Sequence, residues 1–193
     1  MNKKRTVIFG GSFDPIHTGH VALAKEVIDK NIADEVWFMV SPLNPHKQDR
    51  ELTDENQRLQ MVEIAVEGER GLSACDFEFK MPRPSYTLHT LEALEREYPK
   101  RSFSLLIGAD NWEKFDKWYK SDEIKARYPI IVYPRGNNNM PPLPKGVKWL
   151  TAELHEISST EIRRNIAAGT FSTIEKWLSP KVLNYIKKNR LYI

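Results

Sequence analysis

The segment from Gly10 to His20 reads Gly-Gly-Ser-Phe-Asp-Pro-Ile-His-Thr-Gly-His, and it constrains the fold of this chain more than any other stretch. It follows the apolar run Thr6–Phe9, which is typical of a β-strand, and leads directly into a helical pattern at Val21. Glycines after a strand let a ligand approach the backbone closely, and the next helix directs its free N–H groups at the same place. A glycine pair alone is more often a plain tight turn, but the whole arrangement predicts a turn that binds phosphate.

Two imidazole side chains, those of His17 and His20, lie within this segment. They are three positions apart, so in a helical conformation they project from the same side, toward whatever the helix N-terminus binds. A histidine pair beside bound phosphates can donate hydrogen bonds to oxygen atoms that gain charge during a reaction. His17 and His20 are therefore candidate catalytic residues.

Apolar runs of β-type residues alternate with helical patterns along the whole chain, which is typical of a mostly parallel sheet covered by helices on both faces. We expect an α/β fold of the Rossmann-like, doubly wound kind, with a small helical part at the C-terminal end. The expected strands lie near residues 5–9, 35–40, 72–79, 102–107, 129–133 and 147–150. The expected helices lie near residues 19–30, 54–67, 87–98, 121–127, 159–168 and 180–189.

Length and composition narrow the class of protein. The 193 residues are enough to bury a substantial core, and no linker divides them, so we expect residues 1–193 to form a single domain. The net charge is only +3 and basic residues alternate with acidic ones, which argues against a nucleic-acid partner. No apolar run approaches the roughly 20 residues that cross a bilayer, so no membrane partner is expected. The single cysteine, Cys75, predicts a buried, inert thiol and a cytoplasmic protein.

A second informative segment is Ile157–Arg163, which reads Ile-Ser-Ser-Thr-Glu-Ile-Arg. Ser158 and Glu161 have the spacing of a capping box, which predicts that a helix begins here with hydroxyl and N–H groups at its first turn. Arg163 lies within that turn, where a cation opposes the helix dipole and favours a nearby anion. Taken alone, the segment is more simply explained as an ordinary well-capped helix, because capping boxes are common.

Together the two segments resemble a known family. Gly10–His20 resembles the GxFDPxHxGH signature of the nucleotidyltransferase superfamily, and Ile157–Arg163 resembles its ISSTxIR signature, which closes over the triphosphate of a bound nucleotide. The resemblance implies that Arg163 acts with His17 and His20 in catalysis. It also implies an ATP site that includes Gly10, Gly11, Ser12, Phe13, Gly19, Ser159 and Thr160.

Shorter matches across nearly the whole chain resemble the bacterial nicotinate-nucleotide adenylyltransferases. Asn44–Lys47 resembles the PPHK segment of that family, Pro84–Thr87 its PSYT segment, Gly108–Asp110 its GAD segment, and Lys117–Tyr119 its W-Y segment. Three positions depart from the family pattern: Asn44 stands for proline, Arg83 stands for glycine, and Arg135 follows Pro134 where the order Arg-Pro-Gly is usual.

These matches imply roles for further residues. Lys47 joins the catalytic set, and Asp110, at the carboxyl end of a predicted strand, accepts hydrogen bonds from the ribose or base of ATP, with a helix cap as the simpler alternative. Trp118 serves as a platform for a pyridine ring, although a core position would also suit it. The implied site for nicotinate mononucleotide consists of Asp14, Ser85, Tyr86, Thr87, Leu88, Trp118 and Tyr119.

The resemblance thus implies an enzyme that transfers the adenylyl group of ATP to nicotinate mononucleotide, with Mg²⁺ carried in on ATP and no metal site of its own. Two alternatives stay open: phosphopantetheine adenylyltransferase, which shares the first signature, and a non-catalytic nucleotide sensor on the same fold. A homo-oligomer is compatible with the sequence.

Overall fold

A single parallel sheet organises the part of the chain that the computed structural model describes, namely residues 3–42, 52–134, 141–151 and 157–193. Its six strands lie in the order β3-β2-β1-β4-β5-β6, and each neighbouring pair is parallel. The strands are β1 (Lys4–Gly11), β2 (Glu35–Val40), β3 (Leu72–Cys75), β4 (Arg101–Gly108), β5 (Ile130–Tyr133) and β6 (Val147–Trp149). The order reverses between β1 and β4, and such a switch point is where open α/β sheets bind ligands.

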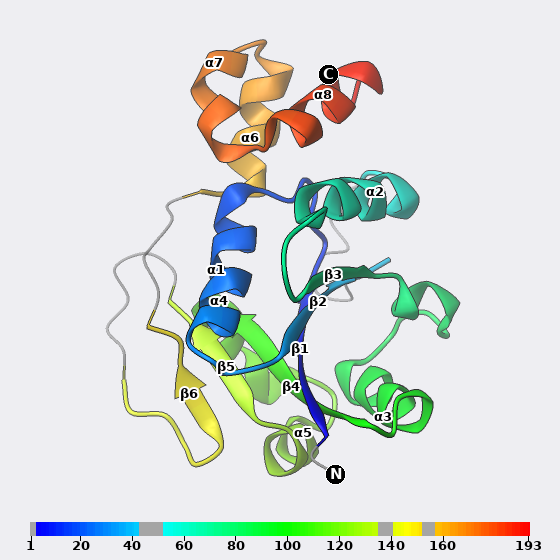
Figure 1. The fold of residues 1–193 in the computed structure, drawn as a ribbon, viewed down its shortest axis with the longest axis vertical. Helices are drawn as coiled ribbons and strands as arrows, with labels where there is room; N and C mark the ends of the chain where they lie inside the picture. Colours follow the sequence, from blue (N-terminus) through cyan, green and yellow to red (C-terminus); the bar gives the residue numbers. More distant parts are fainter. Residues whose placement is uncertain (1–2, 43–51, 135–140, 152–156) are drawn as a thin grey trace.

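Helices cover both faces of this sheet, and three C-terminal helices gather beyond the carboxyl end of β1 (Figure 1). The longer helices are α1 (Thr18–Asp29), α2 (Glu55–Val66), α3 (Thr87–Glu97), α5 (Ser121–Arg127), α6 (Ser159–Ala167) and α8 (Pro180–Lys188). Short turns of helix are α4 (Ala109–Trp112), α7 (Phe171–Ile174), η1 (Phe77–Lys80), η2 (Phe115–Lys117) and η3 (Glu175–Trp177). The expected fold class, including the C-terminal helical part, is confirmed.

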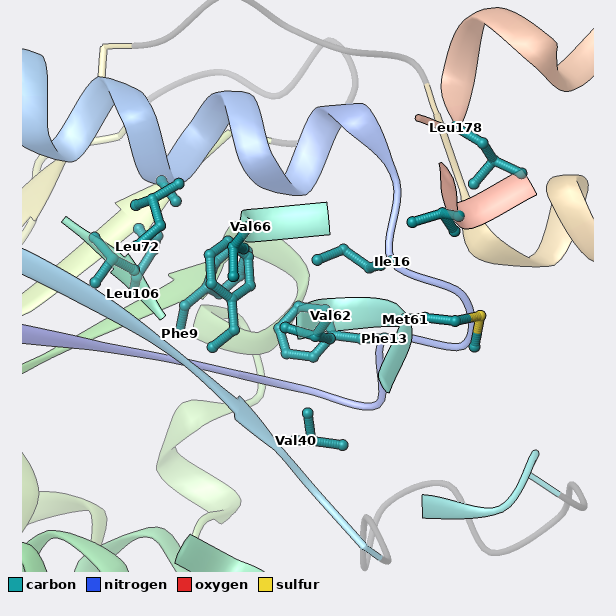
Figure 2. Packing of buried hydrophobic residues seen from close by; sticks show 14 of the residues in the cluster. Phe9, Phe13, Ile16, Val40, Met61, Val62, Val66, Leu72, Leu106 and Leu178 are labelled. Carbon is teal, nitrogen blue, oxygen red and sulfur yellow. The ribbon is translucent and has the colours of Figure 1, made fainter. Parts of the chain in front are cut away.

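Two apolar clusters, one on each face, hold the layers together. Val7 and Phe9 of β1 face the cluster that includes α1, α2 and the C-terminal helices, whereas Ile8 between them faces the cluster with α3 and α5. This alternation follows from the two-residue period of a strand. Figure 2 shows part of the first cluster, where Phe13 and Ile16 of the turn after β1 pack beside Met61 and Val62 of α2. The core therefore reaches up to the turn that the sequence marks as a binding segment.

One expected strand was too long. Residues 72–79 were expected to be extended, but β3 ends at Cys75 and η1 begins at Phe77. The reason is the register: Cys75 pairs with Met39, and β2 ends one residue later at Val40, so the chain has almost no partner strand beyond this point. The thiol of Cys75 is unpaired with another cysteine, and burial raises its pKa to about 11, as suits an inert side chain.

The sequence patterns also missed the single turns α4 and α7, which are too short to show a helical period. Among the described residues, none of the helices combines the length and the apolar composition that crossing a bilayer requires.

Candidate active site

Aromatic packing on the core side supports the turn between β1 and α1. Phe13 adopts a positive φ of 47°, and its ring contacts Phe9, Phe38 and His20 at centroid distances of 5.2 to 5.5 Å. A Cβ atom on Gly11 would meet that ring at 3.0 to 3.2 Å, so the position needs glycine. The side chain of Phe13 is core, and only its backbone remains to serve the ATP site expected for it.

The two histidines lie where the sequence predicts. His17 is the N-cap of α1, and its ring stacks on that of His20 with centroids 3.6 Å apart and planes 24° apart. The backbone N–H of His17 donates to Nδ1 of His20 at 3.3 Å. Because Nδ1 accepts, the neutral imidazole of His20 carries its proton on Nε2, which makes Nε2 the hydrogen-bond donor. Both residues are only 8% exposed, so bulk water competes weakly for such a donor.

The two signature segments meet in space. α6 begins at Ser159, and the Ser158 hydroxyl accepts from the backbone N–H of Glu161 at 3.1 Å, which confirms the predicted helix start. Ser159 Oγ donates to the carbonyl of Pro15 at 2.9 Å. Arg163 Nη1 donates to the carbonyl of Asp14 at 2.6 Å, across 149 positions of sequence.

Thr160 completes this arrangement, because its hydroxyl accepts a hydrogen bond from Arg163 Nη2 at 3.1 Å. Arg163 is therefore fixed in orientation by both segments. The sequence predicts an anion beside this arginine. The two hydrogen bonds described here go to a backbone carbonyl and a hydroxyl group, so the anion stays a prediction.

Two residues that the sequence analysis did not single out support the turn. Arg58 of α2 is 1% exposed and donates to the carbonyls of Ser12 at 2.7 Å and Ser41 at 2.8 Å. It also donates to Thr53 and Pro42. Tyr192 donates to Asp14 Oδ1 at 2.7 Å. Arg58 could have been found from the helical period, since it shares the buried stripe of α2 with Met61 and Val62, where a cation is unusual.

A cavity opens beside the turn, at the switch point of the sheet. Its walls come from the carboxyl ends of β1, β2 and β4, from η1, from the first turns of α3, from α4 and from the segment after η2. It is lined by Ile8, Gly10, Gly11, Met39, Ser41, Glu78, Ser85, Tyr86, Thr87, Thr90, Leu91, Leu105, Leu106, Ile107, Asn111, Trp118 and Tyr119. Seven predicted site residues are among them: Gly10, Gly11, Ser85, Tyr86, Thr87, Trp118 and Tyr119.

Aromatic side chains form the mouth of this cavity. Tyr86 and Tyr119 are 38% and 43% exposed, and their rings lie 4.9 Å apart, each in contact with His89. Trp118 is half-buried and its ring lies 4.9 Å from that of Phe115. These rings give the cavity a flat apolar wall that suits a planar heterocycle.

The N-terminus of α3 supplies the polar end. The helix begins at Thr87 with Tyr86 as its N-cap, so the N–H groups of Thr87 and Leu88 have no acceptor within the helix. The side chain of Leu88 is 1% exposed and belongs to the core, which leaves its backbone N–H as the group that a ligand could use.

Glu78 is a buried acid of the cavity wall that the sequence analysis did not single out. Its carboxyl group accepts from Thr90 Oγ1 at 2.9 Å and from Ser41 Oγ at 3.1 Å. Burial raises the pKa of Glu78, and the hydroxyl groups that donate to it offset only part of that effect. The available signal was its place between Phe77 and Phe79, because an acid inside an apolar segment marks a special environment.

The remaining predicted site residues are spread more widely. Asp14 is 3% exposed and does not line the cavity; its carboxylate accepts from Tyr192 instead. Gly19 is buried in the first turn of α1, and Asp110 is an exposed residue of the first turn of α4. Lys47, with its segment from Asn44, and Arg135 lie outside the described residues. Within the described part of the chain, no three His, Cys, Asp or Glu side chains are grouped as a metal site.

Comparison with known proteins gives a consistent picture. The cytidylyltransferase-like family matches residues 8–165. A protein of Bacteroides fragilis named probable nicotinate-nucleotide adenylyltransferase is 46% identical, over 96% of this chain and 92% of the relative. A protein of Flavobacterium johnsoniae with the same name is 40% identical, over 96% and 97%. The structure of nicotinic acid mononucleotide adenylyltransferase from Plasmodium falciparum, complexed with NaAD, superimposes with a TM-score of 0.80 at 22% identity, over 98% and 97% of the two chains.

Proposed function

We propose that this chain, which belongs to the cytidylyltransferase-like family and within it to the nicotinate-nucleotide adenylyltransferases, transfers the adenylyl group of ATP to nicotinate mononucleotide. The products are nicotinate adenine dinucleotide and pyrophosphate, and the reaction is a step of NAD biosynthesis. One observation carries the proposal: the two signature segments meet at Asp14 and Pro15, directly after the strand whose glycines line the aromatic cavity.

The chemistry needs no nucleophile from the protein. A phosphate oxygen of the mononucleotide attacks the α-phosphorus of ATP, and the bond from that phosphorus to the bridging oxygen breaks as pyrophosphate leaves. The attacking phosphate is already anionic at neutral pH, so catalysis consists of aligning the two substrates and stabilising the charge that develops.

We assign this charge stabilisation to His17, His20, Lys47 and Arg163. The Nε2 proton of His20 and the fixed orientation of Arg163 support the assignment, because donors held in advance need no reorganisation during the reaction. Gly10, Gly11, Ser12, Phe13, Gly19, Asp110, Ser159 and Thr160 complete the proposed ATP site. Mg²⁺ arrives with ATP as part of that substrate.

The cavity is the proposed site for the mononucleotide. The pyridine ring stacks on Trp118, and its carboxylate accepts from the N–H groups of Thr87 and Leu88 at the positive end of α3 and from the backbone N–H of the neighbouring Tyr119. Tyr86 and Ser85 contribute to the wall of this site. Asp14 acts through the shape of the turn, since its carboxylate is engaged by Tyr192. We place the enzyme in the cytoplasm, as one domain, with nucleotides rather than nucleic acid as its substrates.

The test is to incubate the purified protein with ATP and, separately, nicotinate mononucleotide, its amide and 4′-phosphopantetheine, and to measure pyrophosphate. We expect nicotinate mononucleotide to be preferred over its amide by about 10-fold to several-hundred-fold in kcat/KM, because a carboxamide leaves at least one buried N–H donor unpaired. Comparable use of acid and amide would refute the assignment, and release of pyrophosphate with 4′-phosphopantetheine alone would identify a different transferase. Binding of ATP without pyrophosphate release would indicate a sensor.

A pair of variants locates the selectivity. Thr87→Pro removes one backbone donor and should selectively harm use of the acid, whereas Trp118→Ala should weaken the acid and the amide alike, because stacking serves both rings. Circular dichroism of both variants controls for folding. Equal loss of acid and amide in Thr87→Pro would show that the N-terminus of α3 does not read the carboxylate.

A further inference from the structure

Glu78 has an unusual place in the cavity. Within the described residues it is the one carboxyl side chain that lines the cavity, and no lysine, arginine or histidine of that part lines it. The residue is only 8% exposed. A buried acid in a ligand cavity is costly unless something compensates its charge.

The bonds of Glu78 fix the carboxyl group without neutralising it. Thr90 Oγ1 donates to Oε1 and Ser41 Oγ donates to Oε2, and the nearby Ser85 hydroxyl also acts to lower the pKa of Glu78, so these partners are neutral hydroxyl groups. Neither bond brings a positive charge, and no charged neighbour in the described part of the chain contributes to the raised pKa of Glu78. An ionised carboxylate has about four lone-pair sites, so capacity for a further partner remains. As far as the described residues go, this acid is thus oriented but has no counter-ion.

Glu35 is a second buried acid, and its surroundings differ from those of Glu78. Glu35 is 7% exposed and lies at the opposite end of β2, where Lys4 contacts it at 2.6 Å, Arg101 at 2.7 Å and Thr6 Oγ1 at 2.7 Å. Despite its burial, the pKa of Glu35 is lowered, because these donors outweigh desolvation. Within the described ranges, two cations therefore pair with Glu35, whereas the partners of Glu78 are hydroxyl groups.

The proposed substrate carries a positive charge that could pair with the Glu78 carboxylate. This step rests on the proposed function. The ring nitrogen of nicotinate mononucleotide is bonded to the ribose, which gives the pyridine ring a fixed positive charge and leaves the nitrogen no proton to donate. Such a group is recognised by an opposite charge or by an aromatic face. Thr90, which donates to Glu78, lies three residues after Thr87 on α3, about 4.5 Å along the helix axis, so Glu78 and the proposed carboxylate donors belong to the same end of that helix.

We propose that Glu78 is the counter-ion of the cationic pyridine ring, and that it makes the site selective for the oxidised, positively charged form of the mononucleotide. Thr90 and Ser41 act as positioning residues that aim the carboxyl group into the cavity. Trp118 and Glu78 then have separate tasks, since the ring stacks on the first and its charge pairs with the second.

A purely structural role makes a different prediction. If Glu78 only joined η1 to the start of α3, its loss would weaken every ligand of the cavity by the same factor. A counter-ion instead discriminates between two ligands of similar shape and different ring charge. The reduced, 1,4-dihydro form of nicotinate mononucleotide is such a ligand, because its ring nitrogen is neutral.

The experiment measures the dissociation constants of nicotinate mononucleotide and its 1,4-dihydro form by calorimetry, for the full chain at one neutral pH. We expect the wild-type protein to bind the cationic ring about 10-fold tighter or more, which is the size of one partly buried charge pair. Glu78→Gln should lower this ratio severalfold, mainly by weakening the cationic ligand, and leave only the preference that stacking on Trp118 gives. Glu78→Asp, which keeps the charge, should retain a larger ratio than Glu78→Gln. Glu35→Gln is the matched control for loss of a buried acid and should keep the wild-type ratio.

The outcomes separate this inference from the proposed function. A wild-type ratio near one overturns the inference without any variant, and so does a ratio that Glu78→Gln leaves unchanged. A collapse of the ratio in Glu78→Gln alone supports it. If the wild-type protein binds neither form, or releases no pyrophosphate with nicotinate mononucleotide, the proposed function and the inference are refuted together. This result concerns the wild-type protein alone and is therefore distinct from any effect of a Glu78 variant.

Discussion

Replacing Arg58 by methionine tests whether a buried cation holds the phosphate-binding turn in place. Arg58 is 1% exposed and donates to four backbone carbonyls, those of Ser12, Ser41, Pro42 and Thr53, at 2.7 to 3.2 Å. Methionine keeps an unbranched apolar side chain and removes all four donors. The carbonyls of two segments, the turn after β1 and the segment after β2, lose the group that ties both to α2.

The expected loss of folding stability follows from the carbonyl groups that the variant leaves without a donor. A hydrogen bond from a charged donor contributes about 1.5–3 kcal/mol, but the variant also avoids the cost of desolvating the guanidinium, and the same desolvation lowers the pKa of Arg58. Each buried carbonyl left without a donor costs about 1–3 kcal/mol, and the avoided desolvation offsets part of that sum, so we expect a net loss of about 3–5 kcal/mol. At about 2–4 °C per kcal/mol for a chain of this length, the unfolding midpoint should fall by roughly 6–20 °C.

The assay combines thermal unfolding, followed by circular dichroism, with pyrophosphate release at a temperature where the variant is folded. We expect the KM for ATP to rise as well, because Ser12 lies within the turn that Arg58 supports. Arg70→Met is the matched control: Arg70 is exposed, so its loss should change stability by no more than about 0.5 kcal/mol. An Arg58→Met protein that unfolds within about 2 °C of the wild type would show that the network does not stabilise the fold.

Three further predictions concern single side chains. His20→Ala should lower kcat by about 10²-fold or more with little change in ATP affinity, because its bond strengthens as charge develops; an unchanged kcat with a raised KM would remove His20 from the chemistry. Arg163→Ala should lower kcat/KM for ATP while the unfolding midpoint changes by only a few degrees; normal activity in a strongly destabilised protein would contradict this. The Cys75 thiol, with its pKa raised to about 11, should react with iodoacetamide very slowly at pH 8 and about tenfold faster per pH unit above it; a rate that levels off near pH 9 would mean an ordinary thiol.

Most of the fold could be predicted from local patterns. The bounds of β2 and α5 match the expected ranges, and most other strands and helices differ by one or two residues, because periodicity and turn residues act locally. The excess length expected for β3 has a non-local cause, since a strand ends where its partner ends. That information is not in the residues of the strand itself.

The candidate site could be predicted only in part. His17, His20, Ser159 and Arg163 were found because they belong to contiguous segments with specific spacing. Arg58, Glu78 and Tyr192 were missed because their importance arises from tertiary contacts: their partners lie in other elements, and none of the three belongs to a signature segment. Buried charged residues within apolar patterns are the one local sign that such contacts exist.

The bond from Tyr192 to Asp14 has a consequence for how the protein is made. The two residues are 178 positions apart, and Ser159 and Arg163 also reach back to the same turn. A ribosome delivers the N-terminal segment first, so the turn after β1 emerges early and waits for partners that are translated last. Contacts between such distant positions are slow to form. A chain released before Ser159 therefore carries the first signature intact and lacks the bonds that hold it in shape, so translation must pass Tyr192 before this turn can be completed.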